Sequence, residues 1–255
     1  MARIRLKAAP EEGFWQHVDN ALKELELIFL KRKYPSLVWR RLGVKPELFE
    51  EVLRVAVAYH DLGKAYQEYQ RRIPDSSGVK WSVPKHEYFS ALALWRIVRG
   101  LPCRVKKALT AAVMLHHIAT RGPRPEKSIY DWDKYKAPRE VSLSQEVFDE
   151  LVEGFRERVP TSIADPSLIP LKLSLEGIKD LLYNELRSFL AYVGPRGYED
   201  YALTLFILRP IIVCDCRAAG LARSRSLRPF VRDIPSPSVM VKVREVVVNA
   251  AGWLG

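Results

Sequence analysis

Apolar residues recur at helical spacing along most of this chain, and that periodicity limits its fold more than any other feature. Between Phe14 and Lys33, apolar side chains return every third or fourth position, which predicts an amphipathic helix. The same spacing predicts further helices over residues 46–60, 86–98, 103–119, 142–158, 175–193 and 198–222. Proline and glycine separate these stretches, as is typical of the connections between helices. We therefore expect a mainly α-helical protein.

The two ends of the chain depart from the helical pattern. Ile4 and Leu6 alternate with basic residues, and residues 239–244 alternate in a similar way. Alternation is typical of a strand, so we expect either a small β-ribbon formed by the two termini or a C-terminal helix from Ser238. No linker or internal repeat divides the chain. We expect one domain over residues 1–255, with a helical core over about 14–222 and a C-terminal extension over 223–255.

The chain is strongly basic, with a formal net charge of +11 and a pI near 9.6. Such an excess favours polyanionic partners, because each neutralised phosphate releases condensed counterions. The alternative is a basic but inert surface. Against that alternative, basic residues cluster among aromatic ones on which unpaired bases can stack. The clusters are Lys31-Arg32-Lys33, Arg40-Arg41, Arg71-Arg72, Arg104 with Lys106-Lys107, and Arg121 with Arg124 and Lys127, and the aromatic residues are Tyr34, Trp39, Trp81, Tyr130, Trp132 and Tyr135.

Several classes of protein are disfavoured by the sequence. No uninterrupted apolar run reaches membrane-spanning length, so we expect no membrane partner. Charges near the N-terminus are not followed by the apolar core of a secretory signal. The three cysteines, Cys103, Cys214 and Cys216, are an odd number without the spacing of a disulfide framework. We therefore expect a reduced, cytoplasmic protein.

All five histidines of the chain lie in or beside the expected helices, together with two acids. The histidines are His17, His60, His86, His116 and His117, and the acids are Asp61 and Asp215. Imidazole and carboxylate bind divalent transition metals and lower the pKa of bound water. Each residue alone has an ordinary explanation, such as a satisfied core histidine or a helix-packing acid. Together they indicate a two-metal site for phosphodiester chemistry.

The run from His60 to Lys64 is the centre of this pattern. Adjacent helical residues point about 100° apart, so His60 and Asp61 can address two neighbouring points in space. Lys64 lies one turn beyond His60, where its ammonium can hold a phosphate or stabilise charge on it. A solvated surface charge is the alternative for Lys64.

This order of residues resembles the HD-domain superfamily of metal-dependent phosphohydrolases, and in particular the CRISPR-associated HD nucleases. The motifs of that family are His, His-Asp-x-Gly-Lys, His, His-His and Asp, in that order. The matching residues here are His17, His60-Asp61-Leu62-Gly63-Lys64, His86, His116-His117 and Asp215. The resemblance covers about residues 14–222.

The resemblance implies an HD-domain helical bundle that binds two divalent ions. It implies one ion held by His17, His60, Asp61 and Asp215, and a second held by Asp61, His86, His116 and His117. Asp61 and Lys64 are then the expected catalytic residues. Ligation rich in histidine favours Mn, Ni, Co, Fe or Zn over Mg alone. The sequence contains no Gly-x-x-x-x-Gly-Lys-Ser/Thr phosphate loop, so we expect no ATP as cofactor.

The resemblance also implies a function: a stand-alone nuclease that cuts the displaced single strand of DNA in type I CRISPR interference. The implied partners are single-stranded DNA, a separate helicase subunit and a guide-RNA surveillance complex. Two alternatives stay open. One is a phosphohydrolase of nucleotides or cyclic nucleotides, against which the positive charge favours a polymer. The other is a non-catalytic nucleic-acid-binding assembly module.

Overall fold

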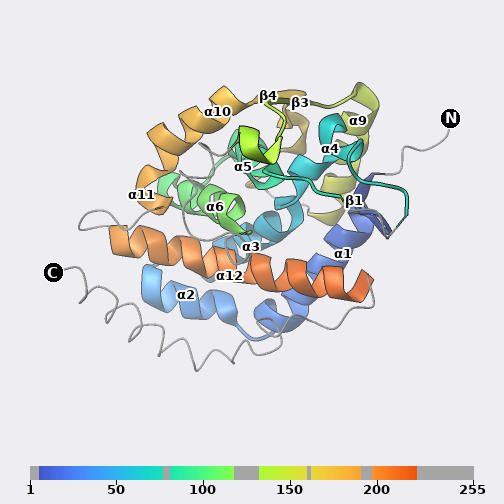
Figure 1. The fold of residues 1–255 in the computed structure, drawn as a ribbon. Helices are drawn as coiled ribbons and strands as arrows, with labels where there is room; N and C mark the ends of the chain where they lie inside the picture. Colours follow the sequence, from blue (N-terminus) through green and yellow to red (C-terminus); the bar gives the residue numbers. More distant parts are fainter. Residues whose placement is uncertain (1–5, 77–80, 118–131, 160–161, 191–196, 223–255) are drawn as a thin grey trace.

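The computed structural model describes residues 6–76, 81–117, 132–159, 162–190 and 197–222 (Figure 1). The helices are α1 (Phe14–Leu25), α2 (Tyr34–Leu42), α3 (Pro46–Tyr59), α4 (Gln67–Gln70), α5 (His86–Ile97), α6 (Cys103–Leu115), α9 (Gln145–Arg158), α10 (Leu175–Asp180), α11 (Arg187–Leu190) and α12 (Gly197–Ala222). Short turns of 3-10 helix are η2 (Leu62–Ala65), η3 (Asp133–Tyr135) and η4 (Pro166–Leu168), and π-helical segments are η1 (Glu26–Leu30) and η5 (Leu181–Leu186). The expectation of a mainly α-helical protein is confirmed.

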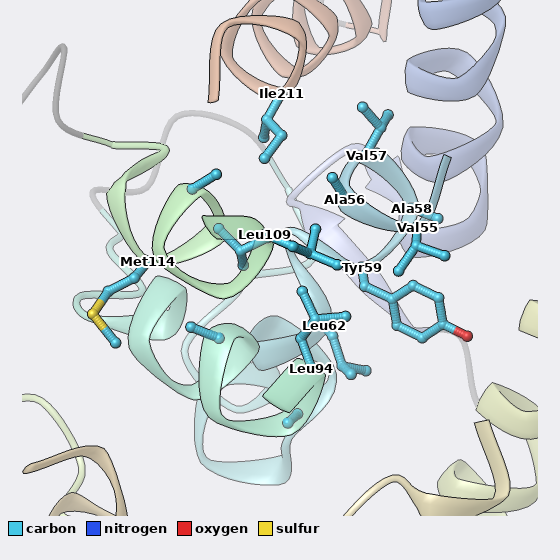
Figure 2. Close-up of a cluster of buried hydrophobic side chains, with 14 of the residues drawn as sticks. Val55, Ala56, Val57, Ala58, Tyr59, Leu62, Leu94, Leu109, Met114 and Ile211 are labelled. Carbon is cyan, nitrogen blue, oxygen red and sulfur yellow. The ribbon is translucent and has the colours of Figure 1, made fainter. Parts of the chain in front are cut away.

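The second half of helix α3 lies at the centre of the core because it is apolar on every side. All residues from Val55 to Tyr59 are buried, and a helix that is apolar all round must be enclosed by other elements. Helices α1, α6 and α12 pack against α3, and α5 packs against α6. Figure 2 shows the α3 side chains beside Leu62, Leu94 and Ile211. The end of α3 therefore places its following residues in the middle of the protein.

Helix α12 crosses the molecule beside α2 and contacts α1, α3 and α6 (Figure 1). It continues through Pro210, which has no N–H to donate to the carbonyl oxygen of Phe206. The hydroxyl of Tyr34 donates a hydrogen bond of 2.9 Å to that same oxygen. The tyrosine thus satisfies the carbonyl that proline leaves without its helical partner.

Several expected helix boundaries move by a few residues. The first helix changes to π-helical geometry after Leu25, and the helix expected over 103–119 ends at Leu115. The helix expected from residue 142 begins at Gln145, because the Ser144 hydroxyl accepts a hydrogen bond from the Val147 N–H and caps the helix there. The stretch 175–190 divides into α10, η5 and α11.

Two short two-stranded antiparallel sheets lie outside the helical core. Strand β1 (Lys7–Ala9) pairs with β2 (Glu12–Gly13), and β3 (Glu140–Ser142) pairs with β4 (Lys172–Ser174). The N-terminal strand therefore pairs with a neighbouring segment, while the expected partner at 239–244 and the extension 223–255 lie outside the described residues. Among the helices that the structure describes, none is both long and apolar enough to cross a membrane.

Candidate metal centre

The ends of three helices and the interiors of two more bring the expected metal ligands together. His60 follows the last residue of α3, His86 is the first residue of α5, and His116 follows α6. His17 lies within α1 and Asp215 within α12. Histidines 17, 60, 86 and 116 are all buried, as is Asp61.

Gly63 allows the turn after His60 and Asp61 to lie directly against α5. A Cβ atom at Gly63 would lie 2.2 Å from the backbone oxygen of His86 and 2.9 Å from the Ser90 hydroxyl oxygen. Only glycine permits this approach, and the Gly63 N–H donates a 2.8 Å hydrogen bond to the Ser90 hydroxyl. The close contact holds the His-Asp pair beside His86.

Hydrogen bonds orient the histidine rings with one nitrogen toward the site. The Nδ1 atoms of His60, His86 and His116 lie 2.8, 2.6 and 2.6 Å from the backbone oxygens three residues earlier. A carbonyl oxygen only accepts, so each Nδ1 carries hydrogen and each neutral ring leaves a lone pair on Nε2. These lone pairs face the shared centre, which is the orientation that a metal ligand requires.

The ligand atoms form two groups that share one carboxylate. Within each group, one ligand atom from every residue lies within 4.8 Å of the others. The first group is His17, His60, Asp61 and Asp215, and the second is Asp61, His86, His116 and His117. The structure therefore brings all seven expected metal residues together, in the arrangement of a two-metal site.

Close contacts between acceptor atoms show that these groups fit cations. His86 Nε2 lies 3.0 Å from Asp61 Oδ1, although both atoms carry lone pairs. His17 Nε2 and His60 Nε2 are 3.4 Å apart. His116 Nε2 is buried and, among the described residues, has no hydrogen-bond partner. Such contacts repel unless a proton or a metal ion lies between the atoms, so the donor set fits divalent ions.

The charges in the centre favour the protonation states that metal binding needs. Burial raises the pKa of Asp61, but the Lys64 ammonium and the His60 ring hold that pKa well below its usual range. Burial lowers the pKa of His86, and it lowers that of His117 strongly together with the charges of neighbouring histidines. The carboxylate is therefore ionised and these imidazoles are neutral at pH 7.

Lys64 lies in η2, buried, with its ammonium bonded to Asp61 Oδ2. The spacing of four residues from His60 predicted that Lys64 would face the metal site. Its ion pair is with Asp61, three residues earlier, because the chain forms a tighter 3-10 turn there. The reading of Lys64 as a solvated surface charge is wrong. Its charge is held inside the centre.

Glu12 is a member of this site that the sequence did not reveal. Its carboxylate lies 2.7 Å from His17 Nδ1, and both groups are buried. A carboxylate behind a metal-ligating histidine fixes the ring and raises its basicity. The β1–β2 hairpin places Glu12 there, and the one signal in the sequence was an acid just before the start of α1.

Comparison with known proteins identifies similar sequences and folds. The family described as Cas3, HD domain, matches residues 7–176. The CRISPR-associated nuclease/helicase Cas3 of Haloferax volcanii is 30% identical over 152 residues, which cover 59% of this chain and 15% of that protein. The chain thus corresponds to a small part of the length of that relative.

The fold is similar to that of a solved HD protein. The CRISPR-associated Cas3 HD domain protein of Methanocaldococcus jannaschii superimposes with a TM-score of 0.54 at 19% identity, covering 82% of this chain and 99% of that one. At this identity the likeness shows the fold, and the family match over 7–176 supplies the relationship. The chain belongs to the Cas3 HD-domain family.

Proposed function

We propose that this protein is a metal-dependent nuclease that hydrolyses phosphodiester bonds in single-stranded DNA. The observation that carries the proposal is the convergence of two His/Asp groups on the single carboxylate of Asp61. The Nε2 atoms of the surrounding histidines face that carboxylate because their Nδ1 hydrogens are held by backbone oxygens. Membership of the Cas3 HD family supports the same chemistry.

The proposed ligands of one ion are His17, His60, Asp61 and Asp215, and those of the other are Asp61, His86, His116 and His117. When bound, two such ions supply an activated water and stabilise negative charge on the phosphate. Asp61 holds both halves of the site together, and Lys64 keeps the Asp61 carboxylate in place while adding positive charge beside the phosphate. This histidine-rich set favours Mn, Ni, Co, Fe or Zn over Mg alone.

The choice of single-stranded DNA rests on charge and on family. A net charge of +11 favours a polyanion over a single nucleotide, because each neutralised phosphate contributes through counterion release. An unpaired strand exposes its backbone and threads a basic surface readily. We further propose that the protein acts in type I CRISPR interference with a separate helicase subunit and a guide-RNA complex. The relative in Haloferax volcanii is named a nuclease/helicase, which supports this assignment.

We also propose that residues 1–255 act as one nuclease domain, with the metal-binding core at about 14–222. The support for a single domain is that residues on or next to α1, α3, α5, α6 and α12 all contribute to one metal centre. No one of these helices holds a complete set of ligands.

The test is a cleavage assay with metal-stripped protein. The protein is reloaded with Mn²⁺ and incubated with a labelled single strand, the same sequence as a duplex, and a panel of nucleotides and cyclic nucleotides. We expect degradation of the single strand, arrest by chelator and little turnover of the nucleotides. Preferred hydrolysis of a nucleotide would instead identify the phosphohydrolase alternative.

Asp61→Ala should abolish cleavage because it removes the carboxylate common to both groups. Asp180→Ala is the matched control, since Asp180 is an exposed acid on α10. Unchanged cleavage by Asp61→Ala would refute the assignment. Binding of DNA without cleavage in any of Mn, Ni, Co, Fe, Zn or Mg would favour the non-catalytic module.

A further inference from the structure

One basic cluster lies on the surface of α2, apart from the metal centre. Between residues 31 and 46 the sequence holds six cations and no acid. The cluster, named here the α2 basic surface, consists of Lys31, Arg32, Lys33, Trp39, Arg40, Arg41 and Lys45, all of them exposed. The indole of Trp39 is 51% exposed although it is among the largest apolar groups of the chain. An exposed indole among cations is not accounted for by packing.

No acid in the described part of the chain neutralises the cations of this surface. Among the residues that the structure describes, none of the six takes part in an ion pair. The nearby acids Glu26 and Glu50 are both paired with Arg54. By contrast, the basic cluster on α6 forms ion pairs within the protein. Arg104 pairs with Glu199 and Asp200, and Lys107 pairs with Glu185 of η5. Charge that finds no internal partner is available to an external anion.

Two helices, α3 and α12, lead from the neighbourhood of α2 to the metal ligands, and their lengths show that the α2 basic surface is distant from the metal centre. The Tyr34 ring, at the start of α2, lies 6.3 Å from Phe49 and 6.2 Å from Phe206. At about 1.5 Å of rise per residue, Phe49 is roughly 17 Å from His60 along α3, and Phe206 is roughly 14 Å from Asp215 along α12. In Figure 1, α2 lies at the edge of the molecule below α12.

We infer that the α2 basic surface binds the phosphate backbone of a single nucleic-acid strand, with a base stacked on Trp39, at a place separate from the metal centre. The six unpaired cations supply phosphate contacts, and the exposed indole supplies the flat apolar face on which any base can stack. An acidic protein surface accounts for the cations but not for the indole.

The inference deepens the proposed function and rests on it for the choice of DNA as the strand. A strand that occupies both places must span a distance comparable to the roughly 14 Å of α12 between Phe206 and Asp215, which is several times the spacing of roughly 3.4 Å between stacked nucleotides. Longer strands therefore gain affinity from α2, while the shortest substrates reach the metal centre alone. The α2 basic surface holds the strand, and the metal centre acts on a distant bond.

Binding in metal-free buffer with chelator tests this surface without cleavage. Fluorescence anisotropy of a labelled oligothymidylate is measured against salt for the variant Lys31→Gln, Arg32→Gln, Arg40→Gln and Arg41→Gln. Lys33 is kept because its backbone φ is +57°. We expect affinity to fall about tenfold or more at low salt, and the slope of log K against log salt to become shallower by about 2 to 3, at roughly 0.7 per lost phosphate contact.

A matched control removes the same charge elsewhere: Arg96→Gln, Arg156→Gln, Lys172→Gln and Arg187→Gln, four exposed residues on α5, α9, β4 and α11 that lie outside every basic cluster named above. The control should bind nearly as the unmodified protein does. Equal losses in both variants would mean that total charge, not this surface, governs binding, and unchanged binding in the α2 variant would overturn the inference outright.

Trp39 gives an independent test that leaves the charge untouched. Trp39→Ala should weaken oligothymidylate binding about fivefold or more, and Trp39→Phe should restore most of it, because stacking needs an aromatic face. Equal binding by the alanine and phenylalanine variants would contradict the stacking role. Hydrolysis of bis(p-nitrophenyl) phosphate by the unmodified protein with Mn²⁺ reports the metal centre alone. Its failure would count against the proposed nuclease and leave the binding results to stand or fall separately.

Discussion

Three histidines of the centre use the same local device. Each Nδ1 donates to the backbone oxygen three residues earlier, at His60, His86 and His116. His60 and His116 follow the ends of α3 and α6, where carbonyl oxygens lack an N–H four residues later, whereas His86 begins α5 and bonds to the Val83 oxygen that precedes the helix. The ring is then fixed with Nε2 pointing out of the helix. Orientation by the backbone makes the site independent of flexible side chains.

At this scale, metal binding should depend on pH through His17. Burial lowers the pKa of His17, but hydrogen bonds with Asp215 and Glu12 outweigh it and raise that pKa to about 9. Below pH 9 the metal-free ring is therefore protonated, and a metal must displace that proton. We expect Mn²⁺ affinity to rise about tenfold per pH unit between pH 7 and 9 for this one proton, and to level above it. Isothermal titration in buffers of different ionisation enthalpy measures the protons released.

Glu12→Gln supplies the comparison for this pH dependence. It removes one of the hydrogen bonds that raise the His17 pKa, so the steep part of the affinity curve should move to lower pH. Glu11→Gln, at the exposed neighbouring position, should leave the curve where it is. Affinity that stays flat from pH 6 to 9 in the unmodified protein would contradict the role assigned to His17.

Gly63→Ala should destabilise the protein and disturb His86. The added Cβ would meet the His86 backbone oxygen at 2.2 Å, and neither backbone segment can retreat without losing contacts. We expect a loss of about 1–3 kcal/mol in the free energy of unfolding, measured by denaturant titration, together with weaker metal binding. Gly13→Ala serves as control because its Cβ would meet nothing closer than 3.9 Å. Equal effects of the two substitutions would show that the close approach is unimportant.

At the scale of elements, α12 depends on α2 for its continuity. Pro210 lies inside a helix of 26 residues, and the hydroxyl of Tyr34 bonds to the oxygen of Phe206 that proline leaves free. Asp215 lies beyond this proline on the same helix. The position of one metal ligand is thus linked to a residue that flanks the α2 basic surface.

Tyr34→Phe should lower the free energy of unfolding by about 1–2 kcal/mol, because a partly buried oxygen loses its donor. Pro210→Ala restores the backbone N–H, so in that background the same tyrosine substitution should cost less. A double-mutant cycle by urea denaturation measures the coupling between the two positions. Additive effects would show that the tyrosine does not replace the missing helical hydrogen bond.

At the scale of the whole molecule, the metal centre joins segments from His17 to Asp215, on α1, α3, α5, α6 and α12. Divalent ions that bind there bind the folded state and not the unfolded chain. Mn²⁺ at about 100 times its Kd should therefore add roughly 2.7 kcal/mol of stability. For a chain of this size that is a rise in Tm of about 5–10 °C.

Differential scanning fluorimetry with added Mn²⁺ and then with chelator measures this stabilisation. Asp61→Asn should lose most of the shift, because the carboxylate shared by both groups is gone. A Tm that does not respond to any divalent ion would mean that the convergent ligands do not bind metal in solution.

Most residues of the candidate site could be predicted from the sequence, because buried histidines beside an aspartate have few structural roles other than metal binding. Five histidines in apolar helices, with a His-Asp-x-Gly-Lys run, are costly to bury without partners, so chemistry alone selected His60 and Asp61. Helical periodicity gave α3, α5, α6 and α12 within a few residues at most ends. The boundaries that moved, at Ser144 and Leu115, depend on caps and on packing that periodicity does not report.

The sequence by itself determined a helical fold, the types of metal ligand and an excess of basic residues, since these follow from residue chemistry and spacing along the chain. Only the tertiary structure decided that Glu12 stands behind His17, that Lys64 bonds to Asp61, and that Tyr34 completes α12. It also separated the paired cations of α6 from those of the α2 basic surface, which form no ion pair with any residue that the structure describes. The reason is physical: contacts between residues distant in sequence depend on how helices pack, and neither periodicity nor charge count contains that information.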